Sequence, residues 1–417
     1  MKEELKKQLS GTERTSDHIR SLQMDLNHQL FINILSDHLH GVNTEIANEI
    51  DWDEILKLSK SHQVEGIVYH QCKRFMPPEV LQLFDNITNT TLYYYANRRA
   101  ALKVVTKELD MKEIPHVVVK GFSIAKYYPI PALRTMGDCD IIVNRKDMPA
   151  AMNVMRSLGY QGIDNDKADS WECTKNNMTF EIHDRLVSGA EFLKLEQEQF
   201  FNEYDAYLVD RELDWSFHFL FLIVHLRKHF INSGVGIRQF VDLGVLIQNC
   251  QELDWIWIER KLMELDLLRF TQTCIWLLGK WFAVESPIGC NPTNRDDDLY
   301  EWVTERILKN GVFGNDDLRN IGNYERNVLI KSEGWMLFRR FKNVIRNTFP
   351  PYDYMRTYPG CNYVDGRPYL LIIAWMHRFF YYYNRKNRNT VRRVMSGTFS
   401  NKERLKEQEE LHKRMGL

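Results

Sequence analysis

Residues 116–143 read HVVVKGFSIAKYYPIPALRTMGDCDIIV, and the central strands of the fold can be predicted from this stretch. The apolar run Val117–Val119 predicts a strand. Lys120-Gly121 follows it and predicts a turn, after which Ile124–Tyr128 predicts a short helix. The stretch therefore begins as strand, turn and helix.

The second part of the stretch places acidic residues at the start of another strand. Asp138-Cys139-Asp140 runs directly into the apolar residues Ile141–Val143. Side chains alternate along a strand, so Asp138 and Asp140 are expected on one face and Cys139 on the other, in the core. Two neighbouring carboxylates are costly unless a positive charge lies between them, and a divalent metal ion is the usual one. Turn chemistry at Gly137-Asp138 is the plainer alternative.

A third acid occurs in a segment that alternates apolar and polar residues. Phe180-Glu181-Ile182-His183 has the pattern of a half-buried strand, with Glu181 and His183 on one face. If this strand pairs beside residues 138–143, Glu181 joins the two aspartates. Three acids on neighbouring strands indicate a metal-dependent phosphoryl or nucleotidyl transfer site.

These residues resemble the polymerase-β-like nucleotidyltransferase superfamily, and more narrowly a bacterial branch described only as "nucleotidyltransferase family protein". The resemblance covers roughly residues 30 to 250. One departure is the first turn, which reads Gly121-Phe122-Ser123 where the superfamily usually has Gly-Ser or Gly-Gly. The motifs that carry the resemblance are Lys120-Gly121, Arg134, Gly137–Ile141, Glu181–His183, His225, Lys228-His229, Arg238 and Asp242.

The resemblance implies a Mg²⁺- or Mn²⁺-dependent enzyme with a nucleoside triphosphate as substrate. It implies that Asp138 and Asp140 hold two metal ions and that Glu181 completes the second metal position, so that these three are both catalytic and metal-binding. It also implies that Lys120 or Arg134 neutralises the leaving pyrophosphate. The nucleotide-binding residues that it implies are Lys120, Gly121, Ser123, Arg134, His183, His225, Lys228, His229 and Arg238.

Two pairs of these residues have plainer explanations. His225 and His229 are four apart on one helical face, a spacing that suits zinc, although no third ligand is evident and a helix core is an alternative. Arg238 and Asp242 are also four apart, which predicts a salt bridge along one helix.

Composition indicates a globular protein kept in a reducing compartment. The chain has 417 residues, 44% hydrophobic and 27% charged, with a formal net charge of −1. This charge gives no global attraction to nucleic acid or to anionic membranes. Seven scattered cysteines fit free thiols. No secretory signal or run of about 18 apolar residues is visible, so we predict a cytoplasmic protein without a membrane span.

The order of elements predicts an α+β fold, a small mixed nucleotidyltransferase sheet flanked by helical regions at both sides. The expected parts are a polar leader (1–25), an N-terminal helical cap (26–110), the nucleotidyltransferase core (111–210), a helical domain covering the site (211–347) and an aromatic and basic C-terminal extension (348–417).

Three functions are compatible with these patterns. The first is transfer of a nucleoside monophosphate to an unidentified hydroxyl of a small molecule, sugar or protein. The second is a weak or inactive nucleotide-binding module, suggested by the irregular turn at residues 121–123. The third is an RNA-directed transferase, for which the basic residues 385–393 are the support, so nucleic acid is possible but not favoured. A lysine or arginine filling the space between the three acids would argue against the enzyme.

Overall fold

The structure is a computed structural model that describes the chain in segments. These segments include most of the predicted nucleotidyltransferase core (111–210). The polar leader (1–25) and the basic stretch (385–393) lie outside the described residues. The described residues between 26 and 228 and between 235 and 311 form a first compact unit, and most of those from 349 onward belong to a second. The described segments are 26–46, 49–163, 170–187, 195–232, 235–287, 297–311, 349, 352–355, 362–364, 366–383 and 410–417.

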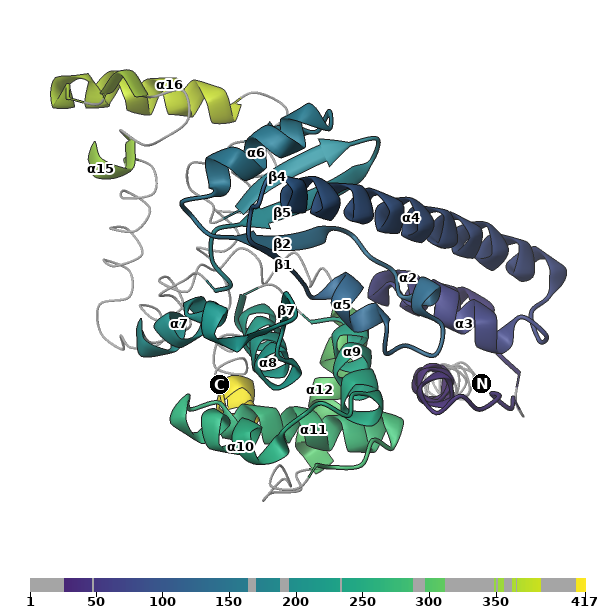
Figure 1. The fold of residues 1–417 in the computed structure, drawn as a ribbon. Coiled ribbons are helices and arrows are strands. Elements are labelled where there is room, and N and C mark those ends of the chain that lie inside the picture. Colours follow the sequence, from purple (N-terminus) through teal and green to yellow (C-terminus); the bar gives the residue numbers. More distant parts are fainter. Residues whose placement is uncertain are drawn as a thin grey trace, which may run out of the picture. The chain divides into compact units, whose positions relative to one another are not determined.

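A five-stranded mixed sheet lies at the centre of the first unit (Figure 1). The strand order is β1-β2-β5-β4-β3, and the only parallel neighbours in this sheet are β2 and β5. This mixed sheet flanked by helices confirms the predicted α+β class. The strands are β1 (His116–Val119), β2 (Cys139–Val143), β3 (Gln161–Ile163), β4 (Ser170–Lys175) and β5 (Met178–His183), with a separate two-stranded ribbon of β6 (Leu208–Val209) and β7 (Glu212–Leu213).

The register of β2 and β5 brings the predicted acids together. Asp140 lies opposite Glu181, and Ile142 lies opposite His183. Because side chains alternate, the intervening residues of both strands point to the other face. That face is the apolar one, since Ile141 and Ile182 are buried in one core cluster.

Two helices cover the apolar face of the sheet. The C-terminal half of α4 (Pro78–Met111) and α6 (Met148–Ser157) pack on it, as Figure 1 shows. Burying each large apolar side chain contributes about 1.5–3 kcal/mol. Helix α6 ends at Ser157, and Gly159 two residues later has a φ of +81°, which favours glycine. The members of this cluster are Val105, Leu109, Ile114, Cys139, Ile141, Val143, Met148, Ala151, Met152, Val154, Met155, Tyr160, Cys173, Phe180 and Ile182.

The turn after β1 enters its helix earlier than the sequence predicts. Helix α5 spans Gly121–Ala125 rather than Ile124–Tyr128. The Ser123 hydroxyl donates to the Val118 carbonyl at 2.9 Å and closes the turn three residues sooner. Glycine suits position 121, because a Cβ there would lie 3.0 Å from the Nη1 atom of Arg134 and that side chain would have to shift.

Further helices of the first unit precede and follow the sheet in the sequence. Asp51 caps α2, accepting from the amides of Asp53 and Glu54. The remaining helices are one over 26–39, α2 (Trp52–His62), α3 (Glu65–Cys72), α7 (Leu195–Asn202), α8 (Trp215–Asn232), α9 (Ile237–Asn249), α10 (Trp255–Glu264), α11 (Leu268–Phe282), α12 (Asp297–Asn310), and the 3-10 turns η1 (Pro131–Leu133) and η2 (Tyr204–Tyr207).

The second unit has a small core of its own. Met355, Val364 and Ala374 are fully buried together. Across the described ranges, no helix combines the length and the apolarity that crossing a membrane requires. The named elements of this unit are α15 (Tyr352–Met355), η3 (Asn362–Val364), η4 (Pro368–Leu370) and α16 (Leu371–Tyr383).

Candidate active site

Asp140 is the centre of the candidate site, on the face of the sheet opposite the apolar core. Its Oδ1 atom accepts from the Lys120 ammonium at 2.7 Å and from His183 Nε2 at 3.0 Å. The Asp140 side chain is only 5% exposed. Burial would raise the pKa of Asp140, but the charge of Lys120 and the hydrogen bond from His183 outweigh it and hold the pKa well below its usual value. Asp140 is therefore an ionised, buried carboxylate.

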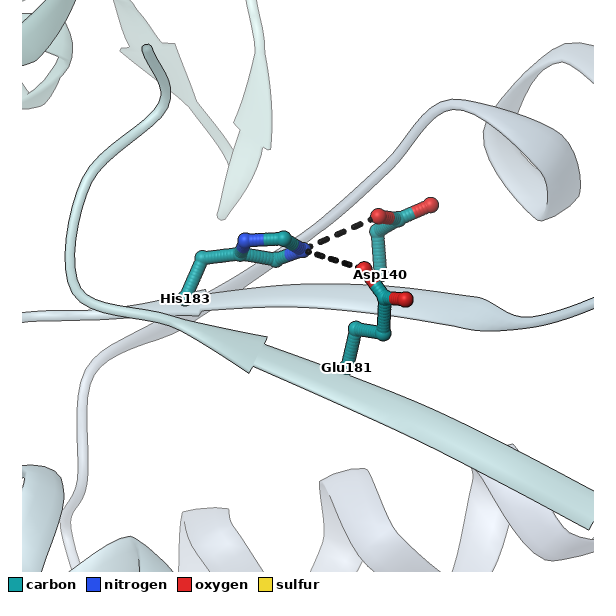
Figure 2. A group of neighbouring side chains, drawn as sticks. All are labelled: Asp140, Glu181 and His183. Atoms are coloured by element: carbon teal, nitrogen blue, oxygen red, sulfur yellow. Dashed lines mark hydrogen bonds and ion pairs between the residues drawn. The ribbon is translucent and has the colours of Figure 1, made fainter. Parts of the chain in front are cut away.

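Glu181 and His183 complete a compact group of possible metal ligands with Asp140 (Figure 2). His183 Nε2 lies 3.3 Å from Glu181 Oε2, so one ring nitrogen approaches both acids. One ligand atom from each of the three residues lies within 4.8 Å of the others. Burial lowers the pKa of His183, but hydrogen bonds to Asp140 and Glu181 more than compensate and raise it. The predicted convergence of β2 and β5 side chains thus includes an imidazole.

Asp138 lies just before β2, in the loop, with an exposed side chain. It is not among the three residues that bring ligand atoms within 4.8 Å of one another. Surrounding protein atoms and the negative charges of Asp140 and Glu181 raise the pKa of Asp138. Asp138 is therefore electrostatically coupled to the group while facing solvent, and its metal-binding role stays a prediction.

Lys120 reaches Asp140 from a strained backbone. Its φ is 57° and its ψ −122°, a region that residues with a Cβ seldom adopt. The amide of Lys120 donates to Nε2 of His218 on α8 at 3.2 Å. Burial lowers the pKa of His218 to about 3, so its ring is a neutral acceptor. The ring also stacks on Trp215, with centroids 4.9 Å apart.

The pattern of residues alone does not indicate His218 as a site residue. Its one signal is a polar residue within the largely apolar run Phe217–Leu226. A buried polar side chain requires a hydrogen-bonding partner, which in a helix facing a sheet can lie far away in the sequence. Here the partner is 98 residues away.

Arg134 occupies a second buried cluster rather than the acid group. Its Nε and Nη2 donate to the two carboxylate oxygens of Asp242 at 2.7 and 2.8 Å. Tyr128 donates its hydroxyl proton to Oδ1 of the same aspartate at 2.6 Å. The predicted Arg238–Asp242 salt bridge is wrong, because Asp242 takes its arginine from a loop across the fold instead of from its own helix. Arg238 instead donates to the Thr135 carbonyl at 2.7 Å and to Gln63.

The other predicted nucleotide-binding residues lie around these clusters. The Ser123 hydroxyl is engaged with the main chain, as described above. His225 faces the ring of Phe221 at 6.3 Å between centroids. Lys228 is exposed near the end of α8, and His229 is grouped with the second unit. Binding of nucleotide by any of these residues stays a prediction.

The donor set fits a divalent ion. Carboxylate oxygens are the ligands that Mg²⁺ and Mn²⁺ prefer, and an imidazole nitrogen is compatible with Mn²⁺. Burial lowers the pKa of Lys120, but the negative charges of Asp140, Asp138 and Glu181 more than compensate and raise it, so three carboxylates stabilise one ammonium. Of these three acids, only Asp140 lies within hydrogen-bonding distance of the Lys120 ammonium, so Glu181 and Asp138 remain as further oxygen ligands.

The sequence model of a family described as "Uncharacterised nucleotidyltransferase" matches residues 48–283, more than half of the chain. No curated protein matches. Among solved structures, the crystal structure of the Megavirus polyadenylate synthase matches with 12% identity and a TM-score of 0.28. That match covers 57% of this chain and 49% of the viral one, so the chain spans about half the length of that protein.

Proposed function

This chain belongs to the family of uncharacterised nucleotidyltransferases, and we propose that it moves a nucleoside monophosphate from a nucleoside triphosphate to a hydroxyl acceptor. The acceptor is a small molecule, a sugar or a protein side chain. The observation that carries the proposal is the parallel register of β2 and β5, which sets Asp140 beside Glu181 with His183 bridging them.

Asp140, Glu181 and His183, with Asp138 at the rim, would hold Mg²⁺ or Mn²⁺. When bound, such an ion polarises a phosphoryl oxygen and lowers the pKa of an attacking hydroxyl. Glu181 is the most exposed of the three ligands, with 32% of its side chain accessible against 5% for Asp140. Of the two acids in this group, Glu181 is therefore the better placed to meet the acceptor.

Residues around the first turn bind and orient the triphosphate. Because Gly121 has no side chain, the backbone of the turn can lie close to the site. Arg134 is committed to Asp242 and holds the loop against Gly121, so in this proposal it positions the turn. Lys120 supplies positive charge next to the acids, where negative charge develops on the leaving pyrophosphate.

Pyrophosphate release tests the proposal. The purified chain is incubated with each of the four nucleoside triphosphates and Mg²⁺ or Mn²⁺ in a cell extract from which enzymes that release or hydrolyse pyrophosphate have been removed. The species that gains mass is then identified by mass spectrometry. Asp140→Asn should slow release at least about 100-fold, because a neutral amide is a poor ligand. The control is Glu212→Gln, which removes an exposed acid paired with Lys126. Release by Asp140→Asn at the wild-type rate would refute the proposal.

The contact between Lys120 and Asp140 favours a second candidate, a nucleotide-binding module without turnover. An ammonium 2.7 Å from the central acid occupies space that a metal ion would need. This candidate predicts that the wild-type chain binds a triphosphate but releases no pyrophosphate with any acceptor fraction. The RNA-directed alternative depends on residues 385–393 and stays a prediction, to be tested by the salt dependence of RNA binding.

A further inference from the structure

Lys120 has an unusual place for a lysine in a site built to hold cations. Its ammonium lies 2.7 Å from Asp140, and both Asp138 and Glu181 also stabilise its positive charge. These are the three acids that the sequence pattern assigns to metal ions. A positive group among three negative ones does part of the work of a divalent ion.

We propose that the Lys120 ammonium is a resident cation that takes the place of one divalent ion, so that the site accepts one exchangeable ion instead of two. The inference extends the proposed function, and it rests on that function only for the role of the exchangeable ion. It concerns the chain's own charge, however, and is tested with metal alone.

Charge balance supports this assignment. Three carboxylates and one ammonium leave two negative charges, which one divalent ion neutralises. Without the lysine the cluster would carry three negative charges, and a single divalent ion would leave one uncompensated. His183 adds at most one positive charge, which a ligating imidazole gives up when a metal ion replaces its proton.

The surroundings of Lys120 hold the ammonium in place. Lys120 follows β1 with a φ of 57°, and its side chain contacts Asp140, which lies opposite Val119 at the end of β1. His218 fixes that conformation by accepting the amide proton of Lys120. The ring of Phe221, also on α8, faces the ammonium at 6.0 Å, within the range of a cation–π interaction. A lysine that merely screened surface acids would not require this support.

A resident cation must weaken the binding of a free one. Two like charges a few ångströms apart repel each other strongly in a partly buried site. A metal ion that approaches Asp140 therefore meets the ammonium or displaces it. Removal of the lysine charge should strengthen metal binding, whereas a lysine that only builds the fold should weaken it when removed.

Titration of the full chain with Mn²⁺ alone, followed by electron paramagnetic resonance of the free ion, tests the inference. We expect Lys120→Met to bind Mn²⁺ at least tenfold more tightly than the wild type. Lys120→Gly should do the same and also suits the backbone at this position. Lys120→Arg keeps the charge and should bind like the wild type. The matched control is Lys126→Met, which removes an exposed lysine paired with Glu212 and should leave the dissociation constant unchanged.

The outcomes separate this inference from the proposed function. Equal or weaker Mn²⁺ binding by both Lys120→Met and Lys120→Gly would overturn the resident cation, whatever the pyrophosphate assay shows. Lys120→Met/Asp140→Asn is compared with Asp140→Asn alone. Absence of the tenfold gain in this comparison would support the resident cation, because the gain must come through Asp140. If the gain appears but the wild type releases no pyrophosphate, the resident cation stands and the proposed function fails.

Discussion

Two buried ion pairs lie on either side of the turn at Gly121, and they differ in charge balance. Arg134 and Asp242 match each other one to one, and Tyr128 also donates to the carboxylate. Lys120 and Asp140 form a single contact inside a group with further acids. In the first cluster the Asp242 carboxylate has its hydrogen bonds satisfied by Arg134 and Tyr128, whereas the second cluster has negative charge in excess.

This difference indicates which cluster serves the fold and which serves a ligand. A buried ion pair whose hydrogen bonds are satisfied holds two chain segments in one arrangement. Excess charge of one sign destabilises a protein unless a ligand neutralises it, and it therefore marks a functional site.

Asp242→Asn should have the largest effect on stability. The substitution leaves the Arg134 guanidinium buried without its counter-charge, which costs about 3–5 kcal/mol of unfolding free energy. Urea denaturation at neutral pH measures it. Arg134→Met/Asp242→Leu, which removes both charges, should recover much of the loss. A loss below about 1 kcal/mol for Asp242→Asn would show that this cluster does not hold the fold.

His218→Gln should reveal a smaller, pH-dependent effect on the Lys120 side of the comparison. The pKa of His218 is lowered in the folded state to about 3 by burial, against about 6.5 when unfolded. The unfolded chain therefore takes up a proton first, and stability is lost as the pH falls from about 6.5 toward 3. Between pH 7 and pH 5 the wild type should lose about 2 kcal/mol more than His218→Gln.

Urea denaturation of both proteins at the two pH values measures this difference. Other buried histidines, such as His38 and His62, contribute equally to wild type and variant and cancel. An equal loss in the two proteins would mean that His218 is not kept neutral, and that the Lys120 amide has lost its acceptor.

Lys126→Met sets the lower limit of the comparison. Lys126 and Glu212 are 2.8 Å apart, but both side chains are about half exposed. Exposed pairs contribute at most about 1 kcal/mol, because solvent screens them. Thermal unfolding should therefore change little in this variant. A loss as large as that of Asp242→Asn would invalidate burial as the basis of the comparison.

The sheet and its acids were predictable from the sequence because they depend on local alternation. Residues 139–143 and 178–183 form strands that contain the predicted segments 141–143 and 180–183, and Glu181 and His183 share the predicted face. Their neighbourhood followed once the two strands were assumed to pair. The period of two along a strand carries this information within each short segment.

The contacts that complete the two clusters were not predictable in this way. Arg134 pairs with an aspartate 108 residues away, and Lys120 depends on an imidazole 98 residues away. The spacing of Arg238 and Asp242 suggested a local pair, but a bidentate fork from Arg134 satisfied the aspartate instead. Which of two arginines reaches a buried carboxylate depends on how helices pack, and no pattern within one helix contains that information.

At position 120 the backbone conformation favours glycine, whereas the neighbouring acids require a positively charged side chain. Glycine would adopt a φ of 57° without strain, yet only a charged side chain can balance the acids beside it. Random mutagenesis screened for heat resistance alone would thus drift toward glycine at this position. Engineering of this chain for thermostability would have to exclude position 120 from its library in order to keep the charge.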